Sequence, residues 1–234
     1  MNRLAATLVC DIRLQIRNGF YYAAGFVALI NILILAQLPS EDLAYWMPPL
    51  ILSNLLINTF YFIAGQVLLE KGEGTLHAQV VTPLKNSEYL ASKVLSLTLL
   101  SLAENLLIVM VGYGIEFNIV LLVSGMVGAA AMYTLCGFVA VSRYSSINEY
   151  LFPSFLYTLA FIPPFFPYGG FEGGWFMYLH PLQAPLTLVQ GAFTGMEGGE
   201  LVYGAFASLV WVIGFFVLGR RVFVRFIVTE GESG

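Results

Sequence analysis

Charged residues are scarce in this sequence. Asp, Glu, Lys and Arg make up 10% of its 234 residues, whereas hydrophobic residues make up 59%, and the mean hydropathy is +0.81. A soluble domain carries about 25% charged residues. The scarcity excludes water as the main solvent of this surface. We therefore predict an all-α integral membrane protein that forms a single domain over residues 1–234.

Residues that carry site chemistry are also few. The two cysteines, Cys10 and Cys136, show neither a disulfide framework nor metal-ligand spacing. The two histidines, His77 and His180, are expected on opposite sides of the membrane, so a cluster of nucleophile, base or metal ligands cannot form at membrane depth. No Gly-Lys pair occurs anywhere, so the phosphate-binding pattern G-x-x-x-x-G-K-[ST] is missing. These absences argue against a catalytic chain and against ATP hydrolysis by this chain itself.

Long apolar runs, by contrast, fill most of the sequence. About 20 apolar residues in a helix cross the roughly 30 Å hydrocarbon core of a bilayer. We predict six transmembrane helices, at residues 19–38, 48–69, 94–113, 118–142, 149–167 and 201–219. Four prolines in or after the fifth stretch limit its helix to roughly 149–162.

The few charges are distributed unevenly between the two sides of this arrangement. All ten basic residues fall on one side: Arg3, Arg13, Arg17, Lys71, Lys85, Lys93, Arg143, Arg220, Arg221 and Arg225. The opposite connections carry only acids: Glu41, Asp42, Glu116, Glu172, Glu197 and Glu200. Positive charge stays on the cytoplasmic side. We therefore expect both termini in the cytoplasm and a multi-pass protein of a bacterial-type plasma (inner) membrane.

Two further segments are predicted to contact the membrane without crossing it. Within residues 1–18, six apolar side chains share one helical stripe of about 140°: Leu4, Ala5, Leu8, Val9, Ile12 and Ile16. Asp11 and the arginines lie outside it. This pattern predicts an amphipathic helix on the inner leaflet, although a plain positive flank that only sets orientation is the alternative. Residues 168–200 are external yet aromatic and glycine-rich, and we expect short re-entrant helices that dip into the outer leaflet. His180, in that segment, is expected to be structural.

The stretch 70-EKGEGTLHAQVVTPLKNSEYLASK-93 is the charged exception on the cytoplasmic side. Thr75 can cap a short helix, Leu76, Val80 and Leu84 recur at a spacing of four, and Pro83 ends that helix. Asn86 or Ser87 can then cap the third transmembrane helix. The pattern predicts a short, rigid helix that lies across the membrane surface between the second and third spans.

This stretch resembles the signature of ABC-2-type transporter permeases, in which an E-x-x-x-G-T-L turn and a T-P-L step join the second and third spans. The match covers Glu70, Glu73 (one position off the commonest acidic spacing), Gly74, Thr75, Leu76, Thr82, Pro83, Leu84, Glu88, Tyr89, Leu90 and Lys93. The six spans, the amphipathic N-terminal helix and the external segment are also similar to that family, over essentially the whole chain. The nearest resemblance is to short bacterial drug-efflux permeases, including fluoroquinolone exporters.

The resemblance implies the membrane subunit of an ATP-driven exporter that moves an amphipathic or hydrophobic substrate, such as a drug, by alternating access. Two separate ATP-binding subunits would hold ATP and Mg, and a second permease, identical or related, would complete the complex; nucleic acid has no part in it. The predicted coupling residues are Glu70, Glu73, Gly74, Thr75, Leu76, Pro83 and Leu84. An ion-coupled secondary transporter without an ATPase is the alternative function. It is disfavoured because no internal repeat is evident and only one ionisable residue lies in mid-membrane.

That residue is Glu104, near the centre of the third span. Glu104 can line a path for cationic cargo, or bond to a neighbouring helix and hold the bundle. Family position adds Asn54, Asn58, Phe62, Phe155 and Thr158 as candidate path residues, with interhelical hydrogen bonds or packing as the alternative for each. The sequence identifies neither the cargo nor the second permease, and it gives the direction of transport only by family analogy.

Overall fold

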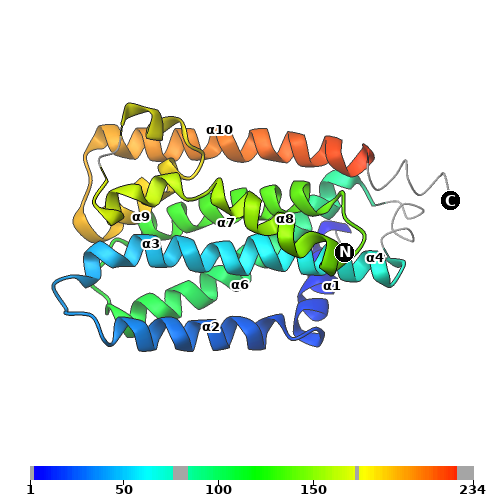
Figure 1. Ribbon diagram of the computed structural model, residues 1–234, viewed down its shortest axis with the longest axis horizontal. Helices are drawn as coiled ribbons and strands as arrows, with labels where there is room; N and C mark the ends of the chain where they lie inside the picture. The colour runs from blue at the N-terminus through cyan, green and yellow to red at the C-terminus, as the bar shows by residue number, and fades with distance from the viewer. Residues whose placement is uncertain (1–2, 76–83, 172–173, 226–234) are drawn as a thin grey trace.

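The computed structural model describes residues 3–75, 84–171 and 174–225, and over these residues the chain is helical without a strand, as predicted. The helices are arranged as a bundle whose long members run side by side (Figure 1). In chain order they are α1 (Arg3–Arg17), α2 (Phe20–Leu35), α3 (Leu43–Leu55), the π-helical η1 (Leu56–Tyr61), α4 (Phe62–Gly72), α6 (Asn86–Gly112), α7 (Ile119–Val141), α8 (Ile147–Leu159), the 3₁₀ turns η2 (Pro163–Gly169) and η3 (Trp175–Leu179), α9 (Gln183–Thr194) and α10 (Gly198–Phe223).

Four helical runs among the described residues are long and apolar enough to cross a bilayer: Leu43–Gly72, Asn86–Gly112, Ile119–Val141 and Gly198–Phe223. The pair α1 and α2, bent by 65°, would be a fifth. The helix α8 has 13 residues, about 20 Å at 1.5 Å per residue, because the chain turns into η2 at Pro163. The count of six spans therefore stays a prediction.

Some helices extend beyond the predicted apolar runs. The third span was predicted from residue 94, yet α6 begins at Asn86, eight residues earlier. Its first turn is capped because the Glu88 carboxylate accepts the backbone N–H of Lys85 at 2.9 Å. Hydropathy marks only the apolar part of a helix, whereas capping and hydrogen bonding continue it through charged residues.

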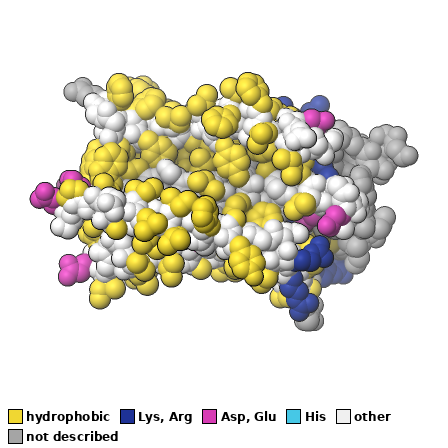
Figure 2. All heavy atoms as spheres, turned by 60° about the horizontal axis from the view of Figure 1, so that its bottom comes forward, with side chains coloured by type: hydrophobic (Ala, Val, Ile, Leu, Met, Phe, Trp, Pro, Cys, Tyr) yellow, Lys and Arg dark blue, Asp and Glu magenta, His cyan; other side chains and the backbone are white. Residues whose placement is uncertain are grey.

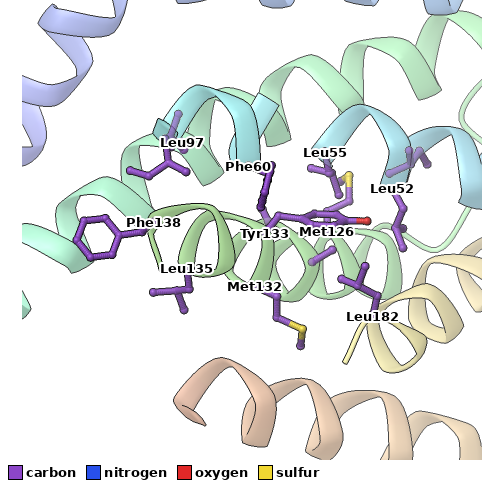
Figure 3. Close-up of a cluster of buried hydrophobic side chains, with 14 of the residues drawn as sticks. Leu52, Leu55, Phe60, Leu97, Met126, Met132, Tyr133, Leu135, Phe138 and Leu182 are labelled. Carbon is purple, nitrogen blue, oxygen red and sulfur yellow. The ribbon is translucent and has the colours of Figure 1, made fainter. Parts of the chain in front are cut away.

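The centre of the bundle is α7, which contacts η1, α4, α6, α9 and α10. Labelled side chains from α3, η1 and α6 converge on it in Figure 3, among them Leu52, Phe60 and Leu97, each at most 1% exposed. Close approach is possible because α7 carries glycine where its neighbours touch it. A Cβ on Gly137 would lie 2.7 Å from the carbonyl oxygen of Phe60. Small residues at such crossings are typical of membrane helices.

The segment that was predicted to be external folds back into the bundle. The helix α9 packs against α7, α10 and α3, and most of its side chains are buried. The N–H of Asn118 donates to the carbonyl of Ala192 at 2.9 Å, which fixes the end of α9 to the start of α7. The expectation of short helices in residues 168–200 agrees with η3 and α9; how deep they lie in a membrane stays a prediction.

The surface has an apolar middle and charged ends. Figure 2 shows Lys and Arg side chains gathered at one end and hydrophobic side chains over the middle, with acidic side chains at both ends. The helix α1 and the end of α10 lie at the same end in Figure 1. This segregation agrees with the predicted distribution of charge, and which end faces the cytoplasm remains an expectation.

Candidate functional site

A buried ionic cluster lies where α1, α4 and α6 meet, at the basic end of the molecule. The ammonium of Lys93 is wholly buried and forms ion pairs with Asp11, at 2.7 Å, and with Glu70. The Ser92 hydroxyl donates to Asp11, and the Tyr89 hydroxyl donates to Glu70 at 2.7 Å. We call these five residues the joint. They come from three helices far apart in the sequence.

The joint is rigid for an electrostatic reason. A buried charge is tolerated only when it is paired and hydrogen-bonded. Lys93 has two carboxylate partners, and each carboxylate also accepts a hydroxyl hydrogen bond. Moving one helix alone would leave a charge unpaired away from water. The three helices are therefore expected to move as one unit.

The joint also explains how α1 attaches to the bundle. The sequence placed Asp11 outside the apolar stripe, and the structure turns Asp11 and Gln15 toward α6, where the Gln15 amide donates to Ser96 at 2.9 Å. Val9 and Ile16, in the stripe, are 42% and 51% exposed. The helix thus docks on protein through polar groups and leaves apolar groups outward. This arrangement suits the predicted contact with lipid.

The predicted coupling residues lie on both sides of a segment that the structure does not describe. Glu70 belongs to the joint. Glu73 ends α4 and lies 3.6 Å from Arg17 in an exposed ion pair. The Thr75 hydroxyl donates to the Glu70 carbonyl at 3.2 Å. Leu84 is partly buried against the core. Leu76 and Pro83, and with them most of the predicted coupling helix, lie outside the described residues.

Gly74 has a distinct role in this segment. Its φ of +69° is a left-handed conformation that residues other than glycine rarely adopt. Among the described residues, apart from its two chain neighbours, no atom lies within 4 Å of where a Cβ would stand. The chain therefore turns out of α4 at Gly74 because of backbone conformation and not because of crowding. One turn earlier, Lys71 donates to the carbonyls of Ser142 and Tyr144 at 2.7 and 2.9 Å, which ties α4 to the end of α7.

Three predicted path residues meet in a second cluster, inside the bundle. The Glu104 carboxylate, 7% exposed, accepts hydrogen bonds from the amides of Asn54, at 3.2 Å, and Asn58. Asn54 also donates to Asn105 at 3.2 Å and accepts from Asn31 of α2 at 3.3 Å. This polar cluster joins α2, α3, η1 and α6. It contains the π-helical turn, a feature that is frequent at functional sites.

The other three predicted path residues lie apart from that cluster. Phe62 follows the π-helical turn and packs edge-to-face against Phe20 of α2, with ring centroids 4.9 Å apart. Phe155 and Thr158 lie on α8, where Phe155 is 70% exposed. The structure therefore does not bring the six residues to one surface of a single chain.

Sequence reasoning missed the joint itself. Lys93 was read as an orientation signal and as the last residue of the family signature, and Asp11 only as a residue outside the apolar stripe of residues 1–18. One signal was present: Lys93 lies seven residues after Asn86, two turns inside a capped helix, which is too deep for a plain interfacial charge. Among the described residues, no group of three His, Cys, Asp or Glu side chains could hold a metal ion.

Comparison with known proteins gives the family. Residues 2–231 match the Fluoroquinolones export permease protein family. Two similar proteins, both named fluoroquinolones export permease proteins, come from the Mycobacterium tuberculosis strains CDC 1551 / Oshkosh and ATCC 25618 / H37Rv. Each is 29% identical over 231 residues, which cover 97% of this chain and 98% of the relative. The match extends over nearly the whole chain, and the chain belongs to the fluoroquinolones export permease protein family.

Proposed function

We propose that this chain is the ABC-2-type membrane subunit of an ATP-driven exporter, and that it carries amphipathic aromatic drugs of the fluoroquinolone type out of the cell. In this proposal, two separate ATPase subunits bind ATP and Mg on the cytoplasmic side. A second permease, identical or related, completes the path, and six transmembrane helices place both termini in the cytoplasm. Family membership and the names of the relatives support the class of protein and the class of cargo.

The joint is the observation that best supports an external motor. It fixes α1, α4 and α6 to one another, and along the chain its residues Glu70 and Tyr89 precede and follow the segment 76–83. A push on that segment would reach the start of one long helix and the end of another together. Because those helices run through the bundle, the push would be carried to the opposite side of the membrane. Such a rigid element suits alternating access between inward-open and outward-open states.

We assign the polar cluster around Glu104 to holding the bundle. Its carboxylate is 7% exposed and accepts hydrogen bonds from two amides of the neighbouring α3 and η1. Phe155 and Thr158, on the outward face of α8, remain candidates for a path shared with the second permease. Phe62, packed on α2, is proposed to support that path from inside the bundle.

The test is drug export by cells that express this chain with and without its ATPase partner. Cells that express this chain and the ATPase should accumulate several-fold less norfloxacin, a fluorescent fluoroquinolone, than cells that express neither protein. Cells that express only one of the two proteins should accumulate as much as cells that express neither. An ATPase that cannot hydrolyse ATP should abolish the difference. Export by this chain alone, abolished by a protonophore, would instead identify the ion-coupled alternative.

A glycine pair tests the predicted coupling segment. Gly74→Ala should reduce export several-fold, because alanine at a φ of +69° costs about 1–2 kcal/mol and redirects the chain leaving α4. Gly72→Ala is the matched control, since a Cβ there also meets no atom within 4 Å and the backbone is helical. ATPase stimulation by drug in the purified complex is the second measurement. Coupled activity in Gly74→Ala equal to that of Gly72→Ala would remove the role given to this turn, and so would unchanged coupling in Glu73→Ala.

A further inference from the structure

A cavity of about 360 Å³ lies between α7, α8 and α10, away from both polar clusters. Cys136, Val139 and Ala140 of α7 form one wall, and Phe215 and Leu218 of α10 form another. Tyr157, Ala160, Phe161, His180 and Pro181 enclose it from α8 and the turn before α9, and Phe60 of η1 borders its inner side. The volume is in the range of small-molecule sites. Among the predicted path residues, none borders this cavity.

Two features of the fold keep the cavity from being filled. First, the wall on α7 presents small side chains at Cys136 and Ala140, where α8 and α10 do not close together. Second, α8 is peripheral: Phe152 and Phe155 are 77% and 70% exposed. The helix is held at its far end, where His180 Nε2–H donates to the carbonyl of Ala160 at 2.8 Å. The space is therefore built by helix placement, with a hydrogen-bonded turn at one end.

The walls select a ligand with an aromatic body. Four aromatic rings border the space: Phe60, Tyr157, Phe161 and Phe215. Phe60 and Phe161 already contact each other edge-to-face, with centroids 5.6 Å apart. Planar rings bind well in such surroundings by offset stacking and edge-to-face contact.

The polar groups of the cavity are divided between its ends. Arg143 borders it at the basic end of the molecule. There the Tyr157 hydroxyl is hydrogen-bonded to that of Tyr144 at 3.1 Å. At the other end, His180 Nδ1 accepts the N–H of Leu182 at 3.2 Å, so both ring nitrogens are engaged within the protein. Burial lowers the pKa of His180, so the imidazole is neutral at neutral pH. Arg143 is thus the one charged group among the described residues that border the cavity.

We propose that this cavity is a binding site, within one permease chain, for aromatic cargo that carries a carboxylate: the rings hold the planar body and Arg143 holds the anion. The inference rests on the proposed function and adds a location and a charge requirement. It differs from the predicted path between two permeases, whose candidate residues are Asn54, Asn58, Phe62, Glu104, Phe155 and Thr158. A lipid acyl chain with an anionic headgroup shares the chemistry, but four rings around a short cavity favour the aromatic ligand.

The experiment measures binding of norfloxacin, and of its methyl ester, to the purified chain in detergent by fluorescence. Arg143→Gln should weaken norfloxacin binding at least about tenfold, the effect of losing one charge-assisted hydrogen bond, and leave the ester unchanged. Ala160→Phe, which fills the space, should abolish binding of both. If Ala160→Phe does not fold, Leu218→Trp is the second filling variant. It fills the space from α10, where the native side chain is 42% exposed. Arg13→Gln and Ala205→Phe, both exposed residues away from the cavity, are matched controls.

The outcomes separate this inference from the proposed function. Folded Arg143→Gln that binds norfloxacin as the wild type does would overturn the charge requirement, and unchanged binding in both filling variants would overturn the site. If cells still export norfloxacin in either case, the binding-site inference is wrong and the proposed function is still supported. If the wild type neither binds nor exports it, both fail. Cavity variants that lose only co-purified phosphatidylglycerol would identify a lipid site and also overturn the inference.

Discussion

At the scale of single residues, the unusual feature is a fully buried lysine between two acids. Lys93 pairs with Asp11 of α1 and Glu70 of α4 and carries no exposed surface. Two carboxylates and one ammonium leave a net negative charge that the hydroxyls of Tyr89 and Ser92 share through hydrogen bonds. Taking these ions out of water costs most of the Coulomb energy that their pairing releases. The cluster therefore adds little to stability, and its main effect is to fix the relative positions of α1, α4 and α6.

Removing the lysine alone should therefore be severe. Lys93→Met leaves two buried carboxylates unpaired, and we expect a loss of about 3–5 kcal/mol in stability. Thermal unfolding and the yield of monodisperse protein measure it. Arg17→Met is the control: its pair with Glu73 is exposed and contributes less than about 1 kcal/mol.

The triple change Asp11→Asn, Glu70→Gln and Lys93→Met separates stability from coupling. It removes all three charges, so folding should recover most of the loss while drug export stays low, because the helices are no longer held by charge. A triple variant that exports at the wild-type level would show that the joint contributes only to folding.

At the scale of helices, Gly137 of α7 lies at a close helix contact, whereas Gly214 of α10 does not. A Cβ on Gly137 would meet Ile63 Cγ2 at 2.6 Å and the Phe60 carbonyl at 2.7 Å. Gly214 of α10 has nothing within 4 Å, and only 11% of the most apolar stretch of α10 is buried. A side chain added at Gly137 would therefore collide with neighbouring helices, whereas one added at Gly214 would not.

Alanine at these two glycines measures that difference. Gly137→Ala should push η1 away from α7 and lower stability by about 1–3 kcal/mol, as overpacking does. Gly214→Ala should be neutral or gain up to about 1 kcal/mol from helix propensity. Thermal unfolding of the two purified variants is the measurement. Equal melting temperatures would mean that η1 and α7 are not in this close contact.

At the scale of the whole molecule, the prediction concerns which end of the helical bundle faces the cytoplasm. In a background with Cys10→Ser and Cys136→Ser, single cysteines at Asp42 and Glu116 should react with a membrane-impermeant maleimide in intact cells. A cysteine at Ser145, exposed in the connection after α7, should react only after the cells are opened. The reason is that basic residues stay in the cytoplasm. Labelling of Ser145→Cys in intact cells would reverse the topology and place the joint outside, beyond the reach of ATP.

The sequence by itself determined the class of molecule and the approximate positions of most of its long helices. Apolar runs can satisfy their backbone groups in lipid only as helices or closed barrels, so composition alone indicated an α-helical bundle. The cap of α6 was predicted at Asn86 or Ser87 and lies at Lys85, one residue earlier, where the Glu88 carboxylate accepts the backbone N–H. These features depend on residues close in the chain.

Only the tertiary structure decided which distant groups meet. Lys93 lies 82 residues from Asp11 and 23 from Glu70, and a charge pattern along the chain cannot distinguish a buried ion pair from an orientation signal. Asn54, Asn58 and Glu104 were foreseen as polar residues, but their mutual hydrogen bonds required α3, η1 and α6 to be packed. The cavity beside Arg143 had no signature in the sequence. It is a space left where three helices diverge, and a space is determined by packing and not by the order of residues.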